Sequence, residues 1–201
     1  MISAILLAAG KASRMGKLKQ LMPFGQSTIV EQAIDNLLRS AVDEVIVVVG
    51  YRAEEVIKTI GTRSVKLVVN PDYKQGMSTS IIAGLKAVDS QGQAVMLALG
   101  DQPLIDSRTV NRLIEEFYDR DKGIAIPTYQ GRRGHPIIFD IKYEEKLLEL
   151  KGDIGGRQIV NDHPDDILEV AVSCKGIIID IDTVDSLALR EVNLVEKTRR
   201  R

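Results

Sequence analysis

The chain has 201 residues and a formal net charge of -1, from 27 lysines and arginines against 28 aspartates and glutamates. This length is enough for one hydrophobic core and predicts a single domain. With this balanced charge, the protein has no strong net positive potential that would attract nucleic acid or an anionic membrane, so neither is expected as a partner. Any bound anion must be held by a local group of cations or N–H donors.

The single cysteine, Cys174, excludes an internal disulfide and a cysteine-based metal cluster within one chain. The apolar run at residues 2–9 has no basic leader and is too short to span a bilayer. We therefore expect a cytoplasmic protein.

Strand-like runs alternate with helical patterns through the first half of the chain. Strands are expected, in chain order, at residues 3–8, 44–49, 65–69 and 94–99. Helical patterns follow them at residues 28–38, 56–60, 81–88 and 110–117. Thr28 and Glu31 have the spacing of a capping box at the start of the first helix.

The second half is less regular. Strands are expected at residues 124–127, at the end of the turn-containing stretch 131–139, and at 167–172 and 176–180. A short helix ends at residues 147–150, a loop covers 152–157, and a C-terminal helix is expected at 184–195. Together with the strand–helix repeat, these elements predict an α/β fold: a single-domain, doubly wound, Rossmann-like three-layer sandwich with a mostly parallel sheet.

In such a sheet, ligands bind beyond the carboxyl ends of the strands. The first strand ends in "LLAAGKASRMGKLKQLMPFG", where Ala8, Ala9 and Gly10 leave backbone N–H groups free to face phosphate oxygens. Arg14 and Lys19 could neutralise those oxygens. The spacing matches neither a P-loop nor the dinucleotide fingerprint. A small-residue turn with solvated cations is the alternative interpretation.

A second candidate site follows the strand in "LALGDQPLI". Asp101 stands at its carboxyl end, opposite the first loop, where a carboxylate could hold Mg²⁺ together with substrate phosphates. The alternative is an aspartate that caps the next helix, although Asp106 and Ser107 stand in better positions for a cap.

These loops, with "GMSTSI", "GRRGHPIIF", "GDIGGR" and "DIDTVDSL", resemble the nucleotidyltransferases that act on the molybdenum cofactor, most of all their cytidylyltransferase branch, within the MobA-like NTP transferase superfamily. The resemblance implies a nucleotide-diphospho-sugar transferase type of fold. It implies transfer of CMP from CTP to the phosphate of molybdopterin with release of pyrophosphate, and Mg²⁺ as cofactor. CTP and the molybdenum cofactor would be its substrates, and a molybdenum hydroxylase client a transient partner.

The resemblance also assigns roles to residues. Residues 1–100 would form the nucleotide-binding half and 101–201 the acceptor-binding half. The catalytic residues would be Arg14, Lys19 and Asp101. The nucleotide would meet Leu7, Ala8, Ala9, Gly10, Arg14, Lys19, Asn70, Ser78, Thr79, Ser80 and Gly100. The acceptor would meet Gln102, Pro103, Arg133, Gly134, His135, Pro136, Asp153 and Arg157.

Asp182 would join Asp101 as a metal ligand, with Asp180 as the alternative, because the usual Pro-Glu-Asp is replaced here by Val184-Asp185-Ser186. Ser78 could equally be only a helix N-cap. His135 could donate to the acceptor, or its motif could be simply a tight turn. The two histidines of the chain, His135 and His163, are too few for a zinc site.

The nucleobase is expected to be cytosine, because the guanylyl-transferring branch resembles "LAGG" with an Asp-Lys pair, whereas this chain has "LAAG" and Lys19-Gln20. Three alternatives stay open: a guanylyltransferase of the same cofactor, a cytidylyltransferase acting on another phosphorylated acceptor such as methylerythritol phosphate, and a non-catalytic carrier of the molybdenum cofactor.

Overall fold

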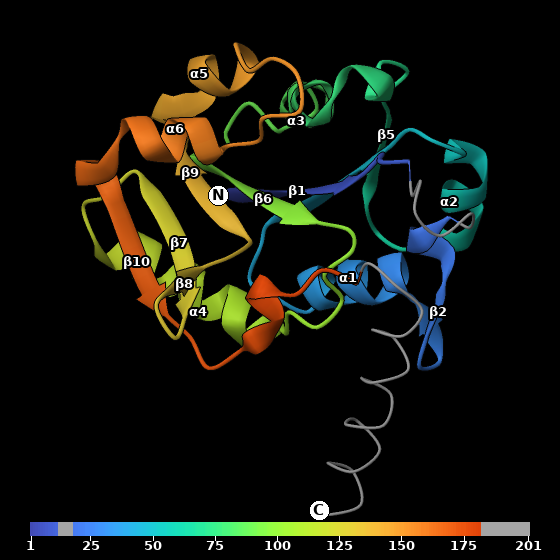
Figure 1. Ribbon diagram of the computed structural model, residues 1–201, viewed down its shortest axis with the longest axis horizontal. Coiled ribbons are helices and arrows are strands. Elements are labelled where there is room, and N and C mark those ends of the chain that lie inside the picture. The colour runs from blue at the N-terminus through green and yellow to red at the C-terminus, as the bar shows by residue number, and fades with distance from the viewer. Residues whose placement is uncertain (12–17, 182–201) are drawn as a thin grey trace, which may run out of the picture.

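The structure, a computed structural model, describes residues 1–11 and 18–181. Its centre is an eight-stranded sheet with the order β10-β7-β9-β6-β1-β4-β5, and β8 pairs with β7 at the side (Figure 1). The strands of this sheet are β1 (Ile2–Ala8), β4 (Glu44–Val49), β5 (Lys66–Val69), β6 (Ala94–Leu99), β7 (Ile124–Tyr129), β8 (Arg132–Arg133), β9 (Ile137–Asp140) and β10 (Ile167–Ala171). A small hairpin adds β2 (Pro23–Phe24) and β3 (Ser27–Thr28).

The sheet is mostly parallel. β1 lies between β4 and β6 in parallel register, with Leu7 opposite Val48 on one side and Leu99 on the other. β9 runs antiparallel to both β6 and β7, and β8 forms an antiparallel hairpin with β7. The two strands that run against the direction of the main sheet, β8 and β9, thus belong to the second half of the chain.

Helices cover both faces of the sheet (Figure 1). They are α1 (Ile29–Leu38), α2 (Ala53–Ile60), α3 (Met77–Leu85), α4 (Ser107–Asp119), α5 (Glu144–Leu148) and α6 (Arg157–Asp162). Five 3₁₀ helices connect them: η1 (Lys19–Leu21), η2 (Tyr73–Gln75), η3 (Ile141–Tyr143), η4 (Pro164–Asp166) and η5 (Lys175–Ile178). Within the two described ranges, none of the helices has the length and apolar character needed to cross a membrane.

Alternation along the strands creates two cores. Ala4 and Leu6 of β1 face the core shared with α1, α2 and α4, whereas Ile5 faces the core shared with α3, α5 and α6. Successive strand residues point to opposite faces, so a parallel sheet covered on both sides needs apolar residues at every position. The predicted single-domain α/β sandwich is confirmed.

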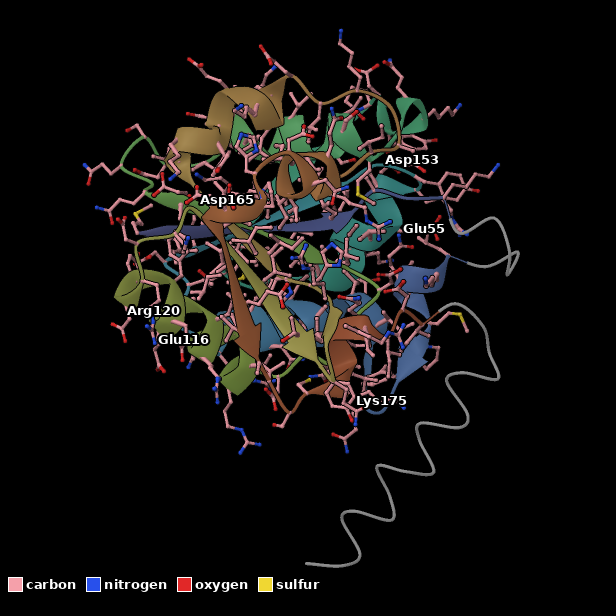
Figure 2. The ribbon with its side chains drawn as sticks, turned by 60° about the vertical axis from the view of Figure 1, so that its left-hand side comes forward. Glu55, Glu116, Arg120, Asp153, Asp165 and Lys175 are labelled. Carbon is pink, nitrogen blue, oxygen red and sulfur yellow. The ribbon has the colours of Figure 1, made fainter. Side chains whose placement is uncertain are left out.

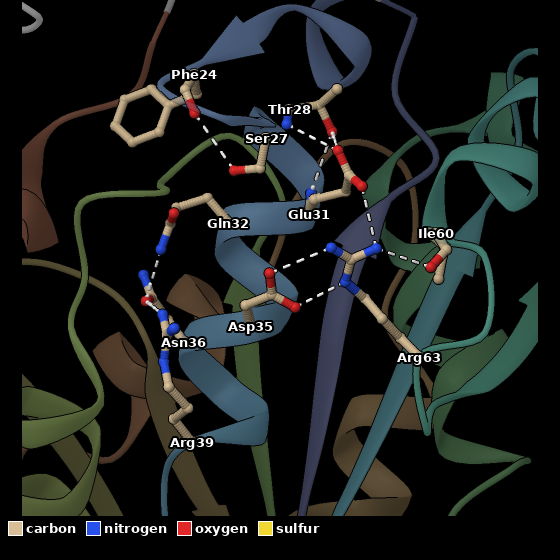
Figure 3. A network of polar contacts seen from close by, with 10 residues as sticks. All are labelled: Phe24, Ser27, Thr28, Glu31, Gln32, Asp35, Asn36, Arg39, Ile60 and Arg63. Atoms are coloured by element: carbon tan, nitrogen blue, oxygen red, sulfur yellow. Dashed lines mark hydrogen bonds and ion pairs between the residues drawn. The ribbon is translucent and has the colours of Figure 1, made fainter.

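The predicted capping box at the start of α1 is also confirmed. The Thr28 backbone N–H donates to Glu31 Oε2 at 2.8 Å, and the Glu31 N–H donates back to Thr28 Oγ1 at 3.4 Å. Arg63 extends this network by donating to Asp35 Oδ1 at 2.7 Å, to Glu31 Oε1 at 3.1 Å and to the Ile60 carbonyl at 2.9 Å (Figure 3). One guanidinium therefore joins α1 to the end of α2.

The prediction of a strand at 176–180 is wrong, because this stretch begins within η5 and forms no ladder. Gly176 packs so closely on the backbone of Leu104 that a Cβ there would lie 2.7 Å from the Leu104 carbonyl carbon. The Ile177 carbonyl accepts from the His135 N–H at 3.0 Å. Contacts with two loops thus replace strand pairing. The helix expected at 184–195 lies outside the described residues.

Candidate functional site

A cleft of about 810 Å³ opens at the carboxyl ends of β1 and β6, the position expected for a ligand site in a parallel sheet. Its walls come from both halves of the chain. The lining residues are Leu7, Ala9, Gly10, Lys11, Lys19, Gln20, Tyr73, Lys74, Gln75, Gly76, Met77, Ser80, Leu99, Gly100, Asp101, Asp153 and Asp180. The cleft therefore brings together the opening loop and Asp101, as the sequence predicted.

An ion pair forms part of the lining of the cleft. Lys19 Nζ is 2.7 Å from Asp101 Oδ2, and the two side chains are 13% and 30% exposed. Lys19 comes from η1 and Asp101 from the loop after β6, so the pair joins segments 82 residues apart. Partial burial strengthens the attraction between charges and leaves both groups accessible to a polar ligand.

The turn after β1 is held from behind by Gln20. Its buried side chain donates through Nε2 to the Gly10 carbonyl at 3.1 Å and to the Ala8 carbonyl at 3.4 Å. Ala8 points into the core, Ala9 lines the cleft, and a Cβ on Gly10 would meet no atom of the described residues within 4 Å. Within the described ranges, the turn at Gly10 is therefore not crowded.

Asn70 organises the start of α3 rather than lining the cleft. It is buried, donates through Nδ2 to Thr79 Oγ1 and Ser80 Oγ, both at 2.9 Å, and accepts the Asp72 N–H at 2.9 Å. Of these residues, Ser80 reaches the cleft. The N-cap alternative for Ser78 is wrong, because Gly76 is the N-cap of α3.

The loop between α5 and α6 closes against the start of α3. Asp153, labelled in Figure 2, accepts the Met77 N–H at 3.2 Å, and the Gly152 carbonyl accepts the Ser78 N–H at 3.1 Å. A Cβ on Gly76 would lie 2.3 Å from the Gly152 carbonyl carbon, so only glycine permits this approach. The loop predicted for the acceptor thus contacts the helix predicted for the nucleotide.

Gln102 organises the other wall. Its buried side chain donates through Nε2 to Asp180 Oδ1 at 2.7 Å and to the Ile177 carbonyl at 3.5 Å. The Ile181 N–H donates to the Asp101 carbonyl at 3.1 Å. These contacts bring Asp180 to the same cleft as Asp101.

His135 lies close enough to this wall for the carboxylates of the wall to affect its pKa. Burial lowers the pKa of His135 below its ordinary value. The carboxylates of Asp180 and Asp101 oppose this lowering, and the cationic Arg157 adds to it. His135 is therefore neutral at pH 7 and has one N–H donor and one acceptor nitrogen.

Several predicted residues lie away from the lining of the cleft. Arg133 donates to Glu169 on β10 at 2.7 Å. The Pro103 carbonyl accepts from Asn36 on α1 at 2.9 Å. Gly134 and Pro136 border His135, and the Gly134 position packs on the Ile177 carbonyl. Arg14 and Asp182 lie outside the described residues.

The donor set fits a divalent cation that arrives with a substrate. In the described part of the chain, no group of three or more acidic, histidine or cysteine side chains is arranged to hold a metal. Asp101 and Asp180 nevertheless line one cleft. Mg²⁺ usually binds one or two carboxylates and completes its shell with water and phosphate oxygens, so these two carboxylates are sufficient.

One segment of the cleft wall, around Tyr73, was not predicted from the sequence. Tyr73, Lys74, Gln75 and Met77 all contribute to the lining. They follow β5, so the strand-end rule that selected Asn70 could also have selected them.

The family model described as a MobA-like NTP transferase domain matches residues 4–167. The chain is 33% identical over 187 residues to the molybdenum cofactor cytidylyltransferase of Escherichia coli (strain K12), which covers 92% of each chain. It is 30% identical over 197 residues to the nicotine blue oxidoreductase of Paenarthrobacter nicotinovorans, covering 92% of this chain and 94% of that one. Among solved structures, Rv0371c of Mycobacterium tuberculosis H37Rv in complex with manganese is similar with a TM-score of 0.80 at 27% identity, covering 94% and 96% of the two chains.

Proposed function

The chain belongs to the MobA-like NTP transferase family, and from this premise we propose that it transfers CMP from CTP to the phosphate of the molybdenum cofactor, with release of pyrophosphate. The observation that carries the proposal is the Lys19–Asp101 pair in the wall of a cleft that both halves of the chain line. The similarity to the cytidylyltransferase of Escherichia coli supports the choice of donor and acceptor.

The reaction joins two anions, so charge is its main obstacle. The acceptor phosphate monoester has a second pKa of about 6, is largely ionised at neutral pH and needs no general base. Its oxygen attacks the α-phosphorus of CTP, the bond to the β-phosphate oxygen breaks, and pyrophosphate leaves with the electron pair. Catalysis then depends on positioning and on cationic groups around the phosphates.

Lys19 is the described residue best suited to that task. Its ammonium lies beside Asp101 and can contact the oxygens of the departing pyrophosphate, while the open turn at Gly10 offers backbone N–H groups to the nucleotide. We propose Arg14 as a second cation for the same charge.

Asp101 and Asp180 would hold the Mg²⁺ in this proposal, with Asp182 as the other candidate ligand. When bound, the cation would offset the charge of the phosphate oxygens. Gln102 would orient Asp180 by its hydrogen bond of 2.7 Å.

The acceptor side of the proposal consists of His135, Arg157 and the residues around them. A neutral imidazole can donate one hydrogen bond to a pterin or a phosphate, and a guanidinium suits a phosphate through paired donors. Arg133 is less suited to this role, since it is already paired with Glu169.

The proposal is tested by incubating the purified protein with Mg²⁺ and molybdenum cofactor, with CTP, GTP, ATP or UTP in separate reactions. We expect pyrophosphate release and a product with the mass of a cytosine dinucleotide with CTP alone. Release with GTP would indicate the guanylyltransferase alternative. Absence of release with every nucleotide, from folded protein and intact cofactor, would refute transfer to the molybdenum cofactor and favour another acceptor or a carrier.

A further inference from the structure

Two tyrosines and two lysines form a cluster on the side of the cleft away from β9. The rings of Tyr51 and Tyr73 have centroids 6.2 Å apart and are tilted by 56°. Lys11 Nζ lies 5.8 Å from the centroid of Tyr51, and Lys74 Nζ lies 6.0 Å from that of Tyr73. Three of these residues, Lys11, Tyr73 and Lys74, line the cleft, so the cluster is part of its wall.

The position of Tyr73 is well defined. A Cβ on Gly50 would lie 2.7 Å from Tyr73 Cβ and 2.9 Å from Ala9 Cβ, so the bare glycine lets Tyr73 and Ala9 approach each other. The Tyr51 N–H donates to the Ala9 carbonyl at 3.1 Å. Tyr73 is half-buried and packs against the core on the α3 side. One part of this side chain is anchored, while another part faces the cleft.

The cluster and the acceptor wall lie on opposite sides of Asp101. Lys11, Tyr51 and Tyr73 follow β1, β4 and β5, whereas His135 precedes β9, on the other side of β6 in the sheet. In nucleotidyl transfer, the α-phosphate lies between the nucleobase and the attacking group. If the phosphates bind at Lys19 and Asp101 and the acceptor at His135, the nucleobase must extend toward β4 and β5.

We propose that the nucleobase stacks on the ring of Tyr73, with Tyr51 bracing this ring from behind. The inference rests on the proposed function, since it assumes that the cleft holds a nucleotide. Aromatic side chains stack on any base because every base has a π face, and such a contact typically strengthens binding about tenfold or more. Tyr73 would therefore supply affinity that does not depend on the base, and the choice of base would rest elsewhere.

The lysine above the ring is consistent with this role. The Lys74 ammonium lies over Tyr73 from an exposed residue, so this side of the ring is accessible. A cation that reaches a ring from an exposed position is weakly bound and easily displaced. A planar base can take its place, which frees Lys74 to approach the phosphates.

The chain contains no tryptophan, so the variant Tyr73→Trp carries a single fluorescent reporter at the proposed platform. The Tyr73 atoms nearest to the Gly50 position are Cβ and Cγ, which tryptophan shares with tyrosine. The variant is titrated with CTP, cytidine, inorganic tripolyphosphate and a phosphate-free pterin. Tyr118→Trp is the matched control, because Tyr118 lies on α4 and is 53% exposed.

We expect CTP and cytidine to quench the fluorescence of Tyr73→Trp, tripolyphosphate to leave it unchanged, and the control to respond to none of them. Quenching by the pterin without quenching by cytidine would overturn the proposal and assign the platform to the acceptor. Unchanged fluorescence with CTP, at concentrations where calorimetry shows CTP bound, would also overturn it.

Two further variants distinguish the loss of the aromatic ring from a general disturbance of the fold. Tyr73→Leu should raise the Kd of CTP about tenfold and leave the Kd of tripolyphosphate unchanged, whereas Tyr73→Phe should bind both like the parent protein. An unchanged Kd of CTP in Tyr73→Leu, with normal turnover in the parent protein, would refute the platform alone. Failure of the proposed function would appear instead as absence of turnover in the parent protein.

Discussion

The two walls of the cleft are built in different ways. On the side proposed for the nucleotide, Ala9 and Gly10 follow β1 and Tyr73 follows β5, and these parallel strands flank β4 in the sheet. On the side proposed for the acceptor, Gln102, His135 and Asp180 come from distant segments, joined through hydrogen bonds to the Ile177 carbonyl and to Asp180. Strand ends therefore position the first wall, and long-range polar contacts position the second.

Each wall contains one buried glutamine that holds backbone or side-chain acceptors through Nε2. Gln20 holds the Ala8 and Gly10 carbonyls, and Gln102 holds the Ile177 carbonyl and Asp180. In both, the Oε1 atom is buried and has no hydrogen-bond partner among the residues that the structure describes. This likeness allows the two walls to be perturbed in matching ways.

The largest effect on turnover is expected from Asp101, which lies between the two walls. Asp101→Asn should lower kcat at least about 100-fold, because it removes the charge that balances Lys19 and can hold the metal. Steady-state kinetics measures this effect, and thermal unfolding should be unchanged because Asp101 is partly exposed. Asp106→Asn is the control, since asparagine caps α4 as well as aspartate does. Normal turnover in Asp101→Asn would remove this residue from the mechanism.

A pH effect on stability is expected next, in the acceptor half. Burial alone would raise the pKa of Asp166, but hydrogen bonds from Tyr143, Lys142 and the Gly123 N–H outweigh it and lower the pKa to about 2. The unfolded carboxyl titrates near 4, so its stabilisation is complete above that pH and is lost as the pH falls toward 2. The loss should amount to at most about 2.5 kcal/mol.

Urea unfolding at pH 5 and pH 2.5 measures this effect. In Asp166→Asn the contribution should be missing at both values, so its free energy of unfolding should change less with pH than that of the parent protein. An equal pH dependence in both proteins would contradict the assignment. Arg63, which holds α1 in the first half, is the comparison point: Arg63→Lys should weaken the protein more at pH 5 than at pH 2.5, because the Glu31 carboxylate that Arg63 contacts loses its charge as the pH falls.

Substitutions of the two glutamines should have the next largest effect, on the KM values, and they test the two walls one at a time. Gln20→Leu should raise the KM for CTP about tenfold, because the turn at Gly10 loses its support, and leave the KM for the acceptor unchanged. Gln102→Leu should raise the KM for the acceptor about tenfold by releasing Ile177, and, because it also releases the proposed metal ligand Asp180, it should raise the Mg²⁺ concentration needed for half-maximal turnover. Each variant is the control for the other in steady-state kinetics. Equal effects on both KM values would mean that the walls do not act separately.

The smallest effect concerns the contact between the walls. Asp153→Ala should lower the free energy of unfolding by about 1 kcal/mol, since the Met77 N–H at the start of α3 loses its acceptor. Asp153→Asn keeps an oxygen at the same position and should remain close to the parent protein. Chemical denaturation compares the three proteins, and a loss as large in Asp153→Asn would show that the charge, rather than the hydrogen bond, matters.

The difference between the walls also explains what the sequence could predict. Local patterns predicted the capping box of Thr28 and Glu31, and the strand-end rule placed Ala9, Gly10 and Asp101 in one cleft. Periodicity could not distinguish the apolar stretch at 176–180 from a strand, because its conformation depends on contacts with Leu104 and His135.

Individual side-chain roles were predicted less well for the same reason. Ser78 could be taken for an N-cap because the true cap, Gly76, is selected by the approach of Gly152 from 76 residues away. Asn70 follows the end of a strand, which is where a ligand-binding residue is expected. Its side chain instead forms hydrogen bonds with Thr79, Ser80 and Asp72.

The most direct test of the two-walled site is a crystal structure of the protein with CTP and Mn²⁺. We expect the triphosphate beside Lys19 and Asp101, the metal on Asp101, and the cytosine on the side of Tyr73, with the space near His135 left for the acceptor. A nucleotide whose base points toward His135, or whose phosphates lie away from Asp101, would contradict the account.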